Sequence, residues 1–230
     1  IKNLGRGEVS TASAITKKIY QVYRYLTTFN FPGRSRKNIE HHYDIGGERG
    51  EKLYDIFLDT KHRLYSCAYW KEDTKTLEEA QQNKINHIVK KLNIKEGQKI
   101  LEVGCGWGGM VFEIAKQTKC EITGISLSKN QIKYCQKKAK ELGLDNQVKF
   151  ELIDYREVKG HYDRIYSVGM FEHVGKKFYN TFFKSMNRLL KDNGQFLLHT
   201  IGVVDSPSPP NKFINKYIFP GGTCPSFSQI

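Results

Sequence analysis

The sequence predicts an α/β fold in which helices cover a doubly wound, mostly parallel sheet. Three observations carry this prediction. Strand and helix patterns alternate regularly from about residue 76, the strand segments are short apolar runs, and a glycine-rich stretch follows the first of these runs. Alternation of this kind implies strand–helix–strand units joined by right-handed crossovers.

The helices are predicted from their start signals and their periodicity. Thr76 lies three residues before Glu79, which is the spacing of a capping box, and a helical pattern follows. A later helix is expected to end at Gly143, because glycine commonly terminates helices. The four predicted helices of the sheet region cover residues 76–92, 110–118, 129–143 and 177–191.

The strands are predicted from short apolar runs between these helices. The first, "KILEVG", is followed directly by the glycine-rich stretch. The five predicted strands cover residues 99–104, 121–126, 148–154, 162–169 and 194–202. After Gly202 the chain holds five of its six prolines, and no further strand can be read there.

Residues 1–40 differ from the rest of the chain. Residues 15–29 form an amphipathic pattern with basic residues on the polar side, and Pro32-Gly33 interrupts it. The segment is predicted to be a helical, basic linker or the end of an N-terminal accessory domain. A helix that lies on an anionic bilayer is the alternative. Residues 41–230 are predicted to form one domain.

Composition restricts the class of protein. The 230 residues are 39% hydrophobic, and no apolar stretch is long enough to span a bilayer. The five cysteines show neither a CxxC pair nor zinc-ligand spacing, so reduced thiols and a cytoplasmic location are expected. The net charge of +13 suits nucleic acid, an anionic membrane or an acidic substrate. No nucleic-acid-binding module is recognisable, so no nucleic-acid partner is expected.

The stretch "EVGCGWGG" (102–109) lies at the carboxyl end of a predicted strand, where ligands bind in doubly wound sheets. A dinucleotide site favours the spacing G-x-G-x-x-G, whereas this stretch has E-x-G-x-G-x-G. A tight turn without a ligand would also use glycine. The pattern resembles motif I of class I S-adenosylmethionine-dependent methyltransferases, which have a Rossmann-like fold.

The resemblance becomes narrower when the whole chain is considered. Eight segments in order resemble cyclopropane-fatty-acyl-phospholipid synthases and, less closely, mycolic acid cyclopropane synthases, from about residue 41 onward. These segments are "HYDIG" (42–46), "YSCAYW" (65–70), "TLEEAQ" (76–81), "EVGCGWGG" (102–109), "ISLSKNQ" (125–131), "SVGMFEHVG" (167–175), "LLHTIG" (197–202) and "INKYIFPGG" (214–222).

The resemblance implies an S-adenosylmethionine site. Tyr65, Ser66, Gly104, Cys105 and Gly106 correspond to residues around the methionine part of the cofactor. Glu102 would organise the turn or reach the cationic amino group. Ser126 and Gln131 stand where an acid commonly binds the ribose, and Asp154 and Tyr155 stand beside the adenine.

The resemblance also implies a reaction. Such enzymes transfer a methylene group from S-adenosylmethionine to the cis double bond of an acyl chain in a membrane phospholipid, through a carbocation, and form a cyclopropane ring. The base in this family is a bound bicarbonate. The residues that correspond to its binding site are Cys67, Glu172, His199 and the backbone at Ile201. No metal is implied.

Class I methyltransferases typically have seven strands, and only five are legible here. The catalytic domain is therefore expected to be incomplete at its carboxyl end, before the last two strands. A fragment is favoured over a natural truncation, and little synthase activity is expected of the isolated chain. A tyrosine that helps to hold bicarbonate in the family has no counterpart here.

The expected partners follow from the same resemblance. They are an unsaturated phospholipid and an anionic lipid surface, with the protein peripheral to the inner face of the membrane. A homodimer stays open, because the sequence does not give the oligomeric state. Two other functions also stay open: methylation of an amine or another lipid position, and binding without catalysis.

Overall fold

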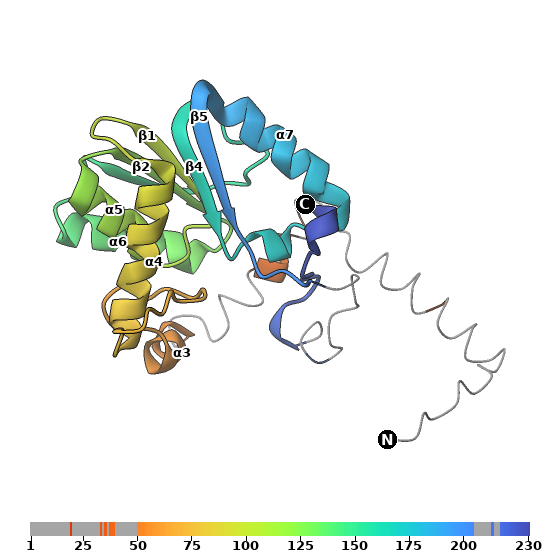
Figure 1. Cartoon of the computed structure of the whole chain (residues 1–230), viewed down its shortest axis with the longest axis horizontal. Coiled ribbons are helices and arrows are strands. Elements are labelled where there is room, and N and C mark those ends of the chain that lie inside the picture. The colour runs from red at the N-terminus through yellow and green to blue at the C-terminus, as the bar shows by residue number, and fades with distance from the viewer. Residues whose placement is uncertain are drawn as a thin grey trace.

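The protein is described by a computed structural model that places residues 19, 33, 35, 37–39, 50–204, 213 and 217–230 (Figure 1). The helix predicted over 15–29, apart from Ile19, and the motif at 42–46 lie outside the described residues. The domain boundary at residue 40 therefore stays a prediction.

The structure confirms the predicted fold class. The described residues form a sheet of five strands in the order β3-β2-β1-β4-β5, and every neighbouring pair is parallel. The chain order reverses between β1 and β4, which is where ligands bind in sheets of this type. The strands are β1 (Lys99–Val103), β2 (Glu121–Ser126), β3 (Val148–Leu152), β4 (Tyr162–Val168) and β5 (Leu190–His199).

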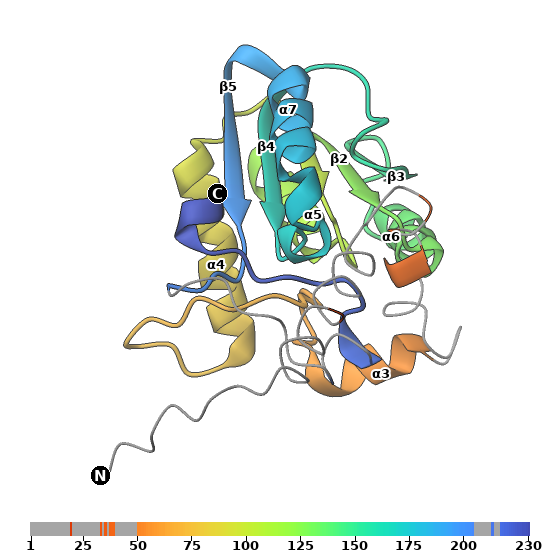
Figure 2. The same cartoon turned by 90° about the vertical axis from the view of Figure 1, so that its right-hand side faces the viewer.

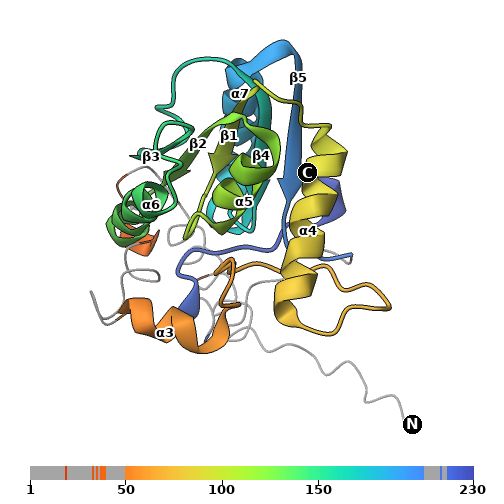
Figure 3. The ribbon, with the colours of Figure 1, turned by 90° about the vertical axis from the view of Figure 1, so that its left-hand side faces the viewer.

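Helices cover both faces of the sheet. Figure 2 shows α7 in front of the strands, and Figure 3, from the opposite side, shows α4 and α5 in front of them. A short helix, α3, lies beyond the ends to which the strand arrows point (Figure 1). The helices are α3 (Gly50–Phe57), α4 (Leu77–Leu92), α5 (Gly109–Thr118), α6 (Lys129–Glu141) and α7 (Tyr179–Leu189).

The alternation of side chains along the strands builds two cores. Ile100 belongs to the cluster that joins the sheet to α4, α5 and α6, whereas its neighbour Leu101 belongs to the cluster that joins the sheet to α7. Phe182 and Met186 supply the α7 side of the second cluster. Because both faces of the sheet are covered, the strands contain consecutive apolar residues. Burial of each large apolar side chain stabilises the folded state by roughly 1.5–3 kcal/mol.

The helix ends agree with the sequence signals, with one difference. The Thr76 hydroxyl accepts a hydrogen bond from the Glu79 amide at 3.2 Å, as the capping box predicts. The Glu79 carboxylate, however, accepts from the Lys75 amide at 2.8 Å rather than from Thr76. Helix α6 ends at Glu141, and Gly143 follows it with φ +64°.

The boundary between the last predicted helix and strand was placed too late in the sequence. The prediction continued the helix to residue 191 and began the strand at 194. Instead, α7 ends at Leu189 and β5 begins at Leu190, with an irregular register opposite Tyr162–Arg164. Lys191 Nζ and Asp163 Oδ1 form an ion pair at 2.9 Å, which links the polar start of β5 to β4.

The end of the chain returns to the carboxyl ends of the strands. The Val203 amide donates to the Pro225 carbonyl at 2.9 Å, and Thr223 donates to the carbonyl of Glu172 at 2.8 Å. This segment, residues 217–226, therefore packs beside the short 3-10 turn η2 (Phe171–His173) that follows β4. In the described part of the chain, no helix is both long and apolar enough to cross a membrane. All five cysteines are free thiols.

Candidate active site

A cavity lies at the carboxyl ends of β1, β2, β3 and β4. All ten residues predicted for the cofactor line it, together with apolar side chains such as Met110, Ile153 and Val174. The ten are Tyr65, Ser66, Glu102, Gly104, Cys105, Gly106, Ser126, Gln131, Asp154 and Tyr155. The parallel topology brings these residues together from positions up to ninety apart in the sequence. Their binding of a cofactor stays a prediction.

The glycine-rich stretch turns the chain from β1 into α5 along the wall of this cavity. Gly104 has φ +91° and Gly106 has φ +51°. Residues that carry a Cβ adopt such positive φ values only at a cost in free energy. A Cβ on Gly104 would lie 2.7 Å from Met170, whereas a Cβ on Gly106 would meet no atom of the other described residues within 4 Å. The amides of Gly104 and Cys105 both donate to the Ile125 carbonyl, which fixes the turn against β2.

Glu102 is a buried acid in the wall of the cavity. Burial raises the pKa of Glu102 to about 8, although the neighbouring Tyr166 hydroxyl and Lys84 ammonium act in the opposite direction. Its Oε2 atom has no hydrogen-bond partner among the residues that the structure describes. A buried carboxyl oxygen without a partner is costly, and a cationic group in the cavity would supply the missing donor.

Ser126 and Gln131 meet at the end of β2. The Ser126 hydroxyl donates to Gln131 Oε1 at 2.8 Å, and it accepts from the Ser128 amide at 3.2 Å. The Ser128 side chain in turn caps α6 by accepting from the Gln131 amide. This network fixes two neutral polar groups on the cavity wall, where the sequence predicts contacts to ribose.

Asp154 and Tyr155 follow β3, and the structure adds a partner that the sequence analysis did not include. Arg156 Nε and Nη2 each lie 2.7 Å from one carboxylate oxygen of Asp154, so both oxygens are bound by one guanidinium group. The guanidinium also lies 5.1 Å from the Tyr155 ring. Arg156 lines the cavity too. Asp154 therefore positions the guanidinium group of Arg156.

Tyr65 and Ser66 belong to the segment before α4 and are held by that helix. Gln81 Nε2 donates to the carbonyls of Leu64 and Ser66, at 3.3 and 3.2 Å. Lys84 Nζ lies 2.6 Å from Ser66 Oγ. The Tyr65 ring packs edge-on against Tyr54 of α3 and stacks against Phe219, with ring centroids 5.7 and 6.4 Å apart.

Three of the four residues predicted to hold bicarbonate form a second cluster beside η2. The Ile201 amide donates to Glu172 Oε1 at 2.6 Å. His199 ends β5, and burial, followed by the charge of Lys84, lowers its pKa. Glu172 Oε2 and His199 Nδ1 are buried, and neither has a hydrogen-bond partner in the described part of the chain. Neither Glu172 nor His199 lines the cofactor cavity itself.

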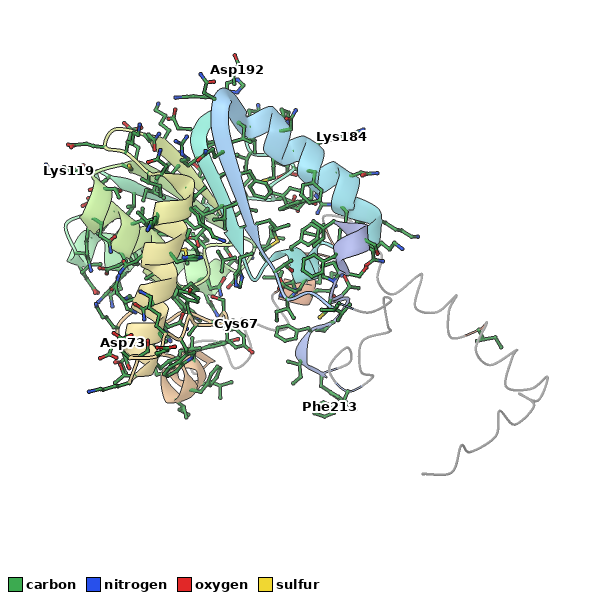
Figure 4. All side chains as sticks on the ribbon, in the orientation of Figure 1. Cys67, Asp73, Lys119, Lys184, Asp192 and Phe213 are labelled. Atoms are coloured by element: carbon green, nitrogen blue, oxygen red, sulfur yellow. The ribbon has the colours of Figure 1, made fainter. Side chains whose placement is uncertain are left out.

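Cys67, the fourth of these residues, is exposed. Figure 4 shows it on the segment that leads into α4. Beyond burial, the charge of Lys84 lowers the pKa of His199, and the charge of Cys67 acts against burial to raise the pKa of Lys84. Lys84 is therefore coupled electrostatically to both Cys67 and His199.

Several cavity residues were missed by the sequence analysis. Arg63 has its guanidinium 4.2 Å from the Trp107 ring and 4.8 Å from the Tyr134 ring. Met170 and His173 follow β4 and also line the cavity. Met170 and His173 lie inside the quoted segment "SVGMFEHVG", which could have indicated them. Arg63 lies outside every quoted segment.

The strand order, the glycine-rich turn after β1 and the cavity above it define the class: this is the fold of class I S-adenosylmethionine-dependent methyltransferases. A cyclopropane synthase from Mycobacterium tuberculosis superposes with a TM-score of 0.76 at 31% identity, over 84% of this chain and 71% of that one. A mycolic acid cyclopropane synthase solved with S-adenosylhomocysteine gives the same TM-score and coverage at 34% identity. Coclaurine N-methyltransferase, at 24% identity, shares the fold alone.

The sequence comparisons give the family. A family model described as mycolic acid cyclopropane synthetase matches residues 32–230. The cyclopropane-fatty-acyl-phospholipid synthase of Escherichia coli K12 is 44% identical over 204 residues, which are 88% of this chain and 51% of that protein. The chain thus spans about half the length of this relative. The chain belongs to the mycolic acid cyclopropane synthetase family, and the resemblance stated from the sequence is confirmed.

Proposed function

We propose that this chain is the catalytic part of a cyclopropane-fatty-acyl-phospholipid synthase. The enzyme transfers a methylene group from S-adenosylmethionine to the cis double bond of an acyl chain in a membrane phospholipid. The observation that carries the proposal is the pairing of two sites: a cavity lined by all ten predicted cofactor residues, and the cluster of Glu172, His199 and Ile201 beside it.

The cavity fits the methyl donor in charge and in shape. Glu102 Oε2 is a buried acceptor without a partner in the described structure, which suits the cationic amino group of the donor. Gly106 leaves open space beside the turn, which suits close approach of a ligand to the backbone. Support also comes from the related mycolic acid cyclopropane synthase whose structure contains S-adenosylhomocysteine.

The second cluster fits bicarbonate. This ion can both accept and donate hydrogen bonds, and the cluster offers a carboxylate oxygen, Glu172 Oε2, and an imidazole nitrogen, His199 Nδ1, without other partners among the described residues. The lowered pKa of His199 favours the neutral ring, whose Nδ1 either donates or accepts according to the tautomer. Cys67, which is exposed on the segment before α4, is included in the proposed site on the family resemblance alone.

The protein's own part in the chemistry is positioning and the exclusion of water. When bound, S-adenosylmethionine would supply the activated methyl group, and bicarbonate would supply the base for the transferred carbon. Met110, Ile153, Val174 and other apolar side chains line the cavity and keep water from the carbocation on the acyl chain, which would otherwise become an alcohol. Glu172 and His199 fix the position of the base.

The proposed partner is an unsaturated phospholipid at an anionic membrane surface, to which the protein binds peripherally. The net charge of +13 supports this, because anionic headgroups attract basic proteins. The cytoplasmic location and the homodimer stay predictions.

The test is lipid mass spectrometry. The full-length gene that contains the coding sequence of this chain is expressed in a bacterium that makes unsaturated phospholipids but lacks cyclopropane fatty acids. The proposal predicts acyl chains that gain one methylene unit and lose the double bond, and a Glu172→Gln variant that abolishes them. Unchanged acyl chains despite soluble, folded protein would contradict the proposed activity, and methyl-branched chains that retain unsaturation would contradict ring formation.

A further inference from the structure

Helix α4 carries a buried lysine that no part of the proposed chemistry uses. Lys84 is 4% exposed, although lysine is rarely buried without a partner. Its ammonium group lies 2.6 Å from Ser66 Oγ and 3.5 Å from the Ser66 carbonyl oxygen. Burial lowers the pKa of Lys84 to about 8, while Asp59, Cys67 and Glu102 act in the opposite direction.

The short contact between Lys84 and Ser66 determines how the serine hydroxyl is used. An ammonium group has only donors, so Ser66 Oγ is the acceptor of this hydrogen bond. The Ser66 proton is then left for a second acceptor, and Ser66 lines the cofactor cavity. Ser66 also packs against the end of β4, since a Cβ on Gly169 would lie 3.4 Å from the Ser66 Cβ.

The charges around the cavity make Glu102 and Ser66 two complementary groups for one ligand. Glu102 presents one buried carboxyl oxygen, Oε2, that has no described hydrogen-bond partner, and Ser66, which also lines the cavity, presents a hydroxyl donor that is polarised by the Lys84 cation. A zwitterionic amino-acid group fits both residues, because its ammonium group can donate to Glu102 and its carboxylate can accept from Ser66. Hydrogen bonds that involve a charged partner are stronger than neutral ones.

We propose that Lys84 is a positioning residue for the amino-acid end of the methyl donor: its ammonium group orients the Ser66 hydroxyl so that it donates to the donor's carboxylate. This inference rests on the proposed function and extends it to a residue outside the cavity lining. Lys84 acts through Ser66 and does not itself contact the ligand.

The proposal is tested by comparing two ligands that differ in this end alone. S-adenosylhomocysteine has the amino-acid group, whereas 5′-methylthioadenosine lacks it. Calorimetric titration of a Lys84→Met variant is expected to show about tenfold weaker binding of S-adenosylhomocysteine, because one charge-assisted hydrogen bond is lost. The binding of 5′-methylthioadenosine is expected to stay unchanged. Ser66→Ala is expected to show the same selectivity, and the double variant is expected to be no weaker than Lys84→Met alone.

The controls separate positioning from folding. Lys90→Met makes the same chemical change at an exposed position of the same helix, and it is expected to leave both affinities unchanged. A buried ammonium is costly, so Lys84→Met is not expected to lower the free energy of unfolding, as measured in urea. Lys84→Leu, which removes both the charge and the donor, replaces it if the methionine variant does not fold, and it is required to show the same ligand selectivity.

Each outcome bears on one proposal. If the wild-type protein binds neither ligand, the proposed function fails. If the wild-type protein binds S-adenosylhomocysteine and Lys84→Met binds it equally well, the function stands and the role of Lys84 is refuted. Equal weakening of both ligands, or additive losses in the double variant, would also overturn the role of Lys84.

Discussion

At the scale of single residues, Glu102 combines a structural cost with a proposed role in ligand binding. The residue is 3% exposed, and its Oε2 atom has no hydrogen-bond partner among the described residues. Such a group is expensive in a core that binds nothing. The cost is understandable if a cation completes the site, as the proposed methyl donor would.

This interpretation predicts that ligand binding releases a proton. With a pKa of about 8, Glu102 is mostly protonated at pH 7, and a bound ammonium group favours the carboxylate. The affinity for S-adenosylhomocysteine is expected to rise from pH 6 toward pH 8 as Glu102 ionises, and to fall again above pH 8 as Lys84, whose pKa is also about 8, loses the proton that orients Ser66. Calorimetry in buffers of different ionisation enthalpy measures the release, and Glu102→Gln should abolish it. A binding enthalpy that does not depend on the buffer at pH 7 would contradict this assignment.

The two glycines of the turn are expected to respond differently to a methyl group. Alanine at φ +91° or +51° costs about 1 kcal/mol of stability, but at Gly104 the methyl group also meets Met170 at 2.7 Å. Gly104→Ala should therefore lower the free energy of unfolding more than Gly106→Ala does. Gly106→Ala should fold and lose ligand affinity, because its methyl group takes up open space in the cavity.

Urea unfolding and calorimetric titration of both variants check this prediction. The two variants serve as each other's control, since they make the same change two residues apart. Wild-type affinity in Gly106→Ala would show that the ligand does not approach this part of the backbone.

At the scale of elements, the segment before α4 depends on one buried carboxylate. Asp59 Oδ2 accepts from the amide and ring of His62, at 2.6 and 2.9 Å, and Oδ1 accepts from the Leu64 amide at 2.9 Å. Burial alone would raise the pKa of Asp59, but these hydrogen bonds outweigh burial and the pKa lies below its ordinary value. Asp59 thus anchors the segment that presents Tyr65 and Ser66.

A lowered carboxyl pKa gives stability that is present above the ordinary pKa of about 4 and is lost as the pH falls through the lowered value. Asp59→Asn is therefore expected to be about 1–3 kcal/mol less stable than the wild type at pH 6, and the difference should shrink toward pH 3. Urea unfolding between pH 3 and pH 6 measures both free energies. A difference that is constant with pH would show that the charge of Asp59 does not stabilise the segment.

The sequence was sufficient to predict the elements of the sheet, because each strand is a distinct apolar run between helical patterns. The start of β5 was missed because residues 191–194 are polar and resemble a turn. In the structure β4 pairs with Leu190 and then with Gln195 onward, so these four residues lie in the irregular part of the register, which their sequence alone does not reveal. In the cavity, the ten residues that the family resemblance points to were predicted, whereas Arg156 was not, and Lys84, which lies outside the cavity lining, was not either. Their roles arise from contacts across the fold, to Asp154 and Ser66, which spacing along the chain does not reveal.

At the scale of the whole molecule, the net charge of +13 is expected to govern membrane binding. The protein should sediment with phosphatidylglycerol vesicles at low salt and much less with phosphatidylcholine vesicles. Salt of about 0.5 M should release it, because screening shortens the range of the attraction. Equal binding to both vesicle types would contradict an electrostatic mode of docking.

The direct passage from α7 into β5 has a mechanical consequence. Leu189 ends the helix and Leu190 begins the strand, so no loop absorbs a movement between them. Ten residues after the helix, the His199 carbonyl of the same strand accepts a hydrogen bond from the Gly169 amide at 3.0 Å. We therefore expect a displacement of α7 to be passed through β5 to the Glu172–His199 cluster. Substitutions on the buried side of α7 are then expected to change the position of His199, and with it the proposed bicarbonate site, without touching either.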